Sequence, residues 1–126
     1  MPNKRILVID DEDDIREVAQ LSLETVPGWE VVTARSGKEG LGMAAVEKPD
    51  AILLDVMMPD MDGPTTFQNL QASPEICHIP VVLLTAKVQA SDRRRFSTLG
   101  VKGVLAKPFD PLTLADQLAE ILGWQM

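Results

Sequence analysis

Five polar side chains stand directly after apolar runs of the sequence, and their types suit phosphoryl chemistry. Asp10 and Asp11 follow ILVI, Asp55 follows AILL, Thr85 follows VVLL and Lys107 follows GVLA. Carboxylates bind divalent cations, while a hydroxyl and an ammonium donate hydrogen bonds to phosphoryl oxygens. If folding brings these residues together, they form a site that handles phosphate with the help of a metal ion.

The charge balance of such a site predicts the metal. Three carboxylates close together repel one another, and a pair about 4 Å apart costs about 4 kcal/mol at an effective dielectric constant of about 20. Lys107 supplies one positive charge and a divalent cation supplies two, which together balance Asp10, Asp11 and Asp55. Because an all-oxygen site with few protein ligands suits Mg²⁺, we predict a bound Mg²⁺ ion.

Asp55 is the expected nucleophile of this site. A carboxylate held against a metal ion and a lysine can attack a phosphoryl group, because both cations offset the charge on the transferred oxygens. Thr85 and Lys107 are then placed to bind those oxygens. Taken singly, the aspartates could also be strand-end caps, since Asp favours turns and helix starts. Their combination with Lys107 favours the catalytic interpretation.

The elements that must position these residues are visible as short apolar runs alternating with amphipathic stretches, a pattern typical of β-α units on a parallel sheet. Most of the runs are apolar throughout, as in strands covered on both faces. The carboxyl ends of such strands share one edge, where ligands bind, so the polar residues should meet there. The predicted strands are Arg5 to Ile9, Glu30 to Ala34, Ala51 to Leu54, Pro80 to Leu84 and Gly103 to Ala106.

Helix signals fill the gaps between these strands, which predicts a doubly wound α/β fold of five strands and five helices. The last helix should bury a stripe of Leu114, Leu118, Ile121 and Leu122. Residues that favour a helix start stand in three other gaps, namely Ser36 with Glu39, Asp62, and Ser91 or Asp92, while Asp110 followed by Pro111 should open the last helix.

Composition limits the class of protein. The 126 residues suit one domain, 1–126, and the net charge of -7 argues against binding the phosphate backbone of nucleic acid. Cys77, the single cysteine, cannot form an internal disulfide, and no apolar run is long enough to span a membrane. We therefore expect a cytoplasmic protein that binds neither nucleic acid nor membrane directly.

Four motifs in this order and spacing resemble the signatures of the response-regulator receiver family of two-component signalling. They are ILVIDDEDD, ILLDVMMPDMDG, VVLLTA and LAKPF, and the resemblance runs from about Lys4 to Leu122. It implies a flavodoxin-like sheet with strand order 2-1-3-4-5, similar to that of the chemotaxis regulators. It also implies a phosphoacceptor that a sensor histidine kinase or a phosphotransfer protein phosphorylates.

The resemblance further implies individual roles. Asp55 would be the phosphoacceptor, Asp11 and Asp55 would bind Mg²⁺ with the main-chain carbonyl of Met57, and Asp10 would act through water. Thr85 and Lys107 would contact the phosphoryl group, and the peptide bond before the proline after Lys107 would be cis.

Switching in this family resembles a population shift, in which the phosphoryl group draws the threonine hydroxyl inward and remodels the face of the fourth helix, fifth strand and fifth helix. This chain has Val104 where most relatives carry Tyr or Phe, so the aromatic part of that switch is missing. Met57 and Lys87 stand two residues after Asp55 and Thr85, which suggests slow self-dephosphorylation.

Two classes of function remain open at this point. The preferred one is a signalling switch without turnover of an external substrate, a monomer or a weak phosphorylation-dependent dimer that acts on an output protein. The other is a Mg²⁺-dependent phosphatase with an aspartate nucleophile, but Met57 occupies the position of its second acid. A phosphorelay carrier and the receiver part of a hybrid kinase also fit, and the ending at Met126 favours a stand-alone regulator.

Overall fold

A five-stranded parallel sheet forms the centre of the molecule in the computed structural model, which describes residues 3–86, 94–96 and 98–124. The sheet has the order β2-β1-β3-β4-β5, which confirms the predicted flavodoxin-like topology. The predicted strand boundaries agree with the observed ones to within one residue. The strands are β1 (Lys4–Ile9), β2 (Trp29–Ala34), β3 (Ala51–Asp55), β4 (Val81–Thr85) and β5 (Gly103–Ala106).

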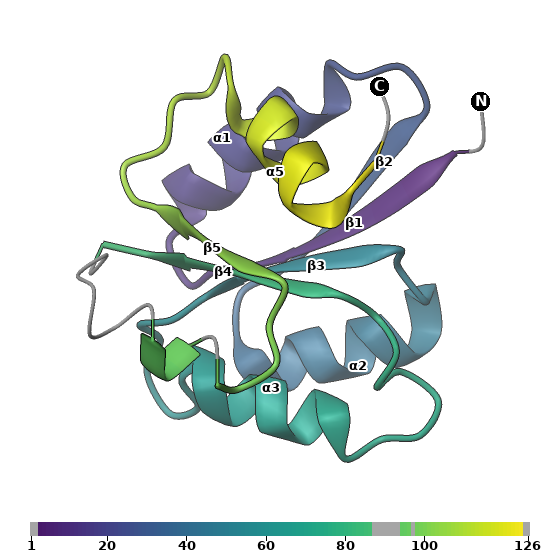
Figure 1. Ribbon diagram of the computed structural model, residues 1–126, viewed down its shortest axis with the longest axis vertical. Coiled ribbons are helices and arrows are strands. Elements are labelled where there is room, and N and C mark those ends of the chain that lie inside the picture. Colours follow the sequence, from purple (N-terminus) through teal and green to yellow (C-terminus); the bar gives the residue numbers. More distant parts are fainter. Residues whose placement is uncertain (1–2, 87–93, 97, 125–126) are drawn as a thin grey trace.

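Helices cover both faces of this sheet (Figure 1). Helices α1 (Asp13–Glu24) and α5 (Leu114–Leu122) lie on one face, and α2 (Gly37–Glu47) and α3 (Gly63–Gln71) lie on the other. Each face has its own buried cluster, one including Leu23 and Leu118, the other including Phe67 and Leu70. The strands between them are buried from both sides, which explains their continuous apolar runs.

The predicted starts of α2 and α3 are confirmed. The Ser36 hydroxyl accepts a hydrogen bond from the Glu39 N–H at 3.1 Å, and the Asp62 carboxylate accepts one from the Thr65 N–H at 2.8 Å. The Glu39 carboxylate accepts from the backbone N–H of Arg35 at 3.3 Å, one residue earlier than in a capping box. Both helices therefore begin where a side chain satisfies a free N–H group.

The last helix begins later than predicted. A turn at residues 111–113 separates Asp110 from the helix; the Asp110 carboxylate accepts a hydrogen bond from the Leu112 N–H at 2.9 Å and its carbonyl accepts one from the Leu114 N–H at 3.0 Å, so Asp110 caps the turn that leads into the helix. Helix α5 begins at Leu114; of its predicted stripe Leu114 and Leu118 are buried, whereas Ile121 and Leu122 are only partly buried. In the fourth gap residues 94–96 are helical, while the predicted caps Ser91 and Asp92 lie outside the described residues.

The turn between β3 and α3 brings the backbone of Gly63 against the end of β3. A Cβ atom on Gly63 would lie 2.5 Å from the Asp55 carbonyl oxygen, and the Gly63 N–H donates to the Val56 carbonyl at 2.9 Å. This close approach holds the chain after Asp55 in place. The predicted cis peptide bond between Lys107 and Pro108 is present. Across the described residues, no helix is long and apolar enough to cross a membrane.

Candidate functional site

The two central strands bring Asp10 and Asp55 together at the carboxyl edge of the sheet. Strands β1 and β3 are neighbours, and their register pairs Ile9 with Leu54, so the next residue of each strand is an aspartate. Asp10 is fully buried and the side chain of Asp55 is 2% exposed. The predicted meeting of these two carboxylates is therefore observed.

Lys107 reaches the same point from β5, on the far side of β4. Its Nζ lies 3.0 Å from Asp10 Oδ2 and 3.1 Å from Asp55 Oδ1. Its backbone N–H donates to the carbonyl of Thr85 at 2.9 Å, which ties the ends of β4 and β5 together. One ammonium thus binds both buried carboxylates, which lie 97 and 52 positions before it in the chain.

Two further acids complete the cluster, one of them unforeseen. The carboxylates of Asp10, Asp11, Glu12 and Asp55 each place an oxygen within 4.8 Å of the others. Glu12 was not among the predicted site residues, yet its Oε1 lies 3.4 Å from Lys107 Nζ. Its place directly after Asp10 and Asp11 in the loop from β1 to α1 is the sequence signal for it.

The electrostatics of the site show a deficit of positive charge. Burial and the neighbouring charge of Asp10 raise the pKa of Asp55 to about 6, although hydrogen bonds from Lys107 and the Met57 N–H act in the opposite direction. Burial acts to lower the pKa of Lys107, but its hydrogen bonds and charge interactions with Asp10 and Asp55 outweigh burial, and the net shift is upward. A single ammonium therefore leaves the buried carboxylates under-compensated.

The donor set suits a small divalent cation. Asp55 Oδ2 is buried and receives no hydrogen bond from the part of the chain that the structure describes, and the buried Asp10 Oδ2 has the Lys107 ammonium at 3.0 Å as its contact. A buried, unsatisfied carboxylate oxygen is costly unless a cation or donor binds it. Asp55 Oδ2 is such an oxygen, and it belongs to a cluster of four carboxylates, which is the ligand type that Mg²⁺ prefers.

Thr85 and Met57 lie at the predicted edge of the sheet. Thr85 is the buried last residue of β4, one position beyond the Leu84 that pairs with Asp55. The Met57 N–H donates to Asp55 Oδ1 at 3.3 Å, while the Met57 side chain is exposed.

Val104 is half-buried and packs against the core on the α2 and α3 face. Lys87 lies outside the described residues.

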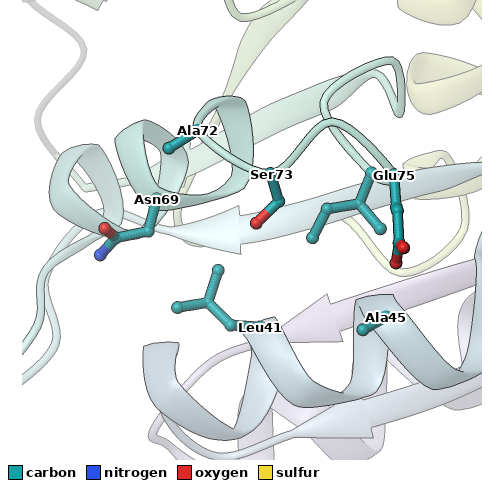
Figure 2. Close-up of a pocket in the computed structure, with 7 residues that line it drawn as sticks. Leu41, Ala45, Asn69, Ala72, Ser73 and Glu75 are labelled. Carbon is teal, nitrogen blue, oxygen red and sulfur yellow. The ribbon is translucent and has the colours of Figure 1, made fainter.

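The hollow shown in Figure 2 lacks the residue types that phosphoryl chemistry needs. It has a volume of about 470 Å³ and lies between α2, which contributes Leu41 and Ala45, and the end of α3 with the segment that follows. Glu75 is the single charged residue of its lining. It contains no residue of the acidic cluster and offers no set of donors for a phosphoryl group.

The chain resembles known proteins over most of its length. The sequence profile of the family described as "Response regulator receiver domain" matches residues 6–119. The probable transcriptional regulator ycf27 of Cyanophora paradoxa is 39% identical over 119 residues, which are 94% of this chain and 48% of that protein. The alkaline phosphatase synthesis transcriptional regulatory protein PhoP of Bacillus subtilis is 39% identical over 120 residues, 95% of this chain and 49% of that protein. The chain thus spans about half the length of these curated relatives.

Solved structures agree with the sequence relatives. The chemotaxis protein CheY4 of Vibrio cholerae superposes with a TM-score of 0.87 at 30% identity, covering 94% of this chain and 98% of that one. The signal receiver domain of a signal transduction histidine kinase from Syntrophus aciditrophicus superposes with a TM-score of 0.81 at 30% identity, covering 95% and 90%. The profile match, the shared fold and the acidic edge of the sheet together show the family. This chain belongs to the response regulator receiver domain family of two-component signalling.

Proposed function

We propose that the chain accepts a phosphoryl group on Asp55 in a Mg²⁺-dependent reaction and acts as a signalling switch. The observation that carries this proposal is the environment of the Asp55 carboxylate. Its Oδ1 is bound by Lys107 Nζ at 3.1 Å and by the Met57 N–H at 3.3 Å. Its Oδ2 is buried without a hydrogen-bond partner from the described residues, so one oxygen is held while the other is available for a new bond.

The residues around Asp55 supply the rest of the chemistry. Mg²⁺, held by Asp11, Asp55 and the main-chain carbonyl of Met57, with Asp10 acting through water, would offset the charge of the incoming phosphoryl oxygens. The Asp55 carboxylate forms a bond to phosphorus while the bond from phosphorus to the donor breaks, and the donor leaves with the electron pair. Lys107 and Thr85 bind the transferred oxygens. The product is an acyl phosphate on Asp55.

The donor and the output are proposed by class. A sensor histidine kinase or a phosphotransfer protein would supply the phosphoryl group from a phosphohistidine. The curated relatives are named transcriptional regulators and extend well beyond the region matched here, whereas one solved relative is the receiver of a histidine kinase. We therefore place the output in a separate protein or in a further segment, and expect a monomer or a weak phosphorylation-dependent dimer.

The test is intact mass spectrometry after incubation with Mg²⁺ and acetyl phosphate. The wild-type chain should gain one phosphoryl group, and Asp55→Asn or omission of the metal should abolish the gain. A folded wild-type chain that binds Mg²⁺ and gains nothing, even from a phosphorylated kinase, would contradict the proposal.

The phosphatase alternative is distinguished by turnover. An aspartate-nucleophile phosphatase protonates its leaving group with an acid two residues beyond the nucleophile, and here that position holds Met57, whose thioether cannot donate a proton. Incubation with p-nitrophenyl phosphate should release essentially no nitrophenol. Sustained release that is lost in Asp55→Asn would favour the enzyme instead.

A further inference from the structure

Arg16, in the second turn of α1, is directed toward the acidic site rather than toward solvent. Its Nη1 donates to the main-chain carbonyl of Asp10 at 2.7 Å, and its Nη2 contacts the carboxylate of Asp13. The Arg16 side chain is 14% exposed, whereas that of Asp13 is 88% exposed. The shielded contact of this guanidinium is therefore the one with the backbone of a site residue.

The loop from β1 to α1 is held at several further points. The Asp10 N–H donates to the Ala34 carbonyl at 3.1 Å, which fixes the entrance to the loop. The Glu12 N–H donates to Asp10 Oδ1 at 2.9 Å, and the Arg16 N–H donates to the Glu12 carbonyl at 3.1 Å. The Asp10 carbonyl belongs to the peptide unit that leads into Asp11. Its orientation determines where the Asp11 and Glu12 side chains point.

We propose that Arg16 is a positioning residue for the metal site, and this inference rests on the proposed function. By binding the Asp10 carbonyl, Arg16 fixes the peptide plane between Asp10 and Asp11. The carboxylates of Asp11 and Glu12 are then held within 4.8 Å of those of Asp10 and Asp55. Without the guanidinium this peptide unit can rotate, and each bound ion must first reorder the loop.

Four variants separate this role from a contribution to folding. Arg16→Met and Arg16→Gln remove the guanidinium and its charge, and Arg16→Lys keeps a charge and a donor on a flexible stem. Asp13→Asn is the matched control, because it removes the surface ion pair of Arg16 but leaves the bond to the Asp10 carbonyl in place. Circular dichroism melts without metal show which variants are folded.

The measurements are the Mg²⁺ dissociation constant from calorimetry and the Mg²⁺ dependence of phosphorylation by acetyl phosphate. Loss of a residue that orients metal ligands typically weakens metal binding about tenfold or more, and we expect this for Arg16→Met and Arg16→Gln. The maximal rate at saturating Mg²⁺ should stay close to that of wild type, since Arg16 does not touch the reacting atoms. Arg16→Lys should recover part of the affinity, and Asp13→Asn should match wild type.

A folded Arg16→Gln or Arg16→Met variant with wild-type Mg²⁺ affinity overturns the inference, as does an equal loss of affinity in Asp13→Asn. These outcomes differ from failure of the proposed function itself. In that case the wild-type chain would bind Mg²⁺ but gain no phosphoryl group.

Discussion

At the scale of single residues, the site consists of carboxylates that are short of positive charge. Asp10 and Asp55 are buried and share one ammonium, that of Lys107, which lies 3.0 Å and 3.1 Å from them. Burial of a carboxylate disfavours its charged form, and a second carboxylate nearby adds to the effect. The protein therefore maintains in Asp55 a group that gains stabilisation from a cation.

The pH dependence of the free energy of unfolding should reveal the cost of burying the charged Asp55 carboxylate. The pKa of Asp55 is raised from 3.8 to about 6, so between these values the folded state binds more protons than the unfolded state, and the free energy of unfolding falls as pH rises. The penalty is fully present above pH 6 and amounts to about 3 kcal/mol. In metal-free buffer, Asp55→Asn should be more stable than wild type at pH 7 by up to that amount and should lose this advantage near pH 4. Urea unfolding at both values measures it, and an advantage that does not change with pH would contradict the assignment.

Lys107 and Glu12 should differ sharply in their contributions. Glu12 is 61% exposed at 3.4 Å from Lys107 Nζ, and a pair of this kind is worth about 1 kcal/mol or less. Lys107→Met leaves Asp10 and Asp55 buried without their cation and should lower the free energy of unfolding by about 3 kcal/mol at pH 8. Glu12→Gln should change it little. Chemical denaturation of both variants without metal checks the contrast, and equal losses would show that the buried pairs carry no special weight.

At the scale of elements, the site depends on how closely the turn after β3 follows the strand. Gly63 begins α3 where a Cβ atom would lie 2.5 Å from the Asp55 carbonyl oxygen and 2.8 Å from the Val56 Cα. These neighbours are backbone atoms, which cannot move aside as a flexible side chain can. The start of α3 and the end of β3 therefore share one rigid geometry.

Gly63→Ala should disturb both stability and phosphorylation. Overpacking of this kind typically costs about 1–3 kcal/mol, and the displaced turn should slow phosphorylation of Asp55. Gly42→Ala is the matched control, because a Cβ there meets nothing within 4 Å and Ala favours a helix interior by about 1 kcal/mol. Thermal melts and acetyl phosphate labelling of both variants provide the comparison. A Gly63→Ala chain as stable as Gly42→Ala would show that the turn can relax.

At the scale of the whole molecule, the sheet collects residues from both ends of the chain at one edge, with α1 and α5 on one face and α2 and α3 on the other (Figure 1). Val104 on β5 packs against the α2 and α3 side of the sheet. Its side chain therefore belongs to the core that these two helices cover. A ligand that binds at the edge contacts several strands at once and should stabilise the whole fold.

Binding of Mg²⁺ should raise the stability of the folded state in proportion to the occupancy of the site. At ten times the dissociation constant a ligand that binds only the folded state adds about 1.4 kcal/mol. We expect such a gain in the free energy of unfolding of wild type on adding Mg²⁺, and little gain in Asp11→Asn or Asp55→Asn. The measurement is urea unfolding with and without metal at constant ionic strength. Equal gains in all three chains would indicate a general salt effect.

The sequence by itself determined the strands, the starts of α2 and α3, and which polar residues meet at the carboxyl edge of the sheet. This is possible because the continuous apolar runs and the caps are local patterns, and because parallel strands always bring their carboxyl ends to one edge. Asp10, Asp55, Thr85 and Lys107 could therefore be placed together from their positions in the chain, and the strand order followed from the resemblance of the motifs.

Only the tertiary structure decided the details that depend on distance and burial. The pKa of Asp55 near 6 requires knowing that Asp10 is its neighbour and that water is excluded. The contact of Glu12 with Lys107 joins residues 95 positions apart, and the contact of Arg16 with the Asp10 carbonyl depends on how α1 leaves the sheet. Such contacts depend on the packed geometry, which no local pattern of residues encodes.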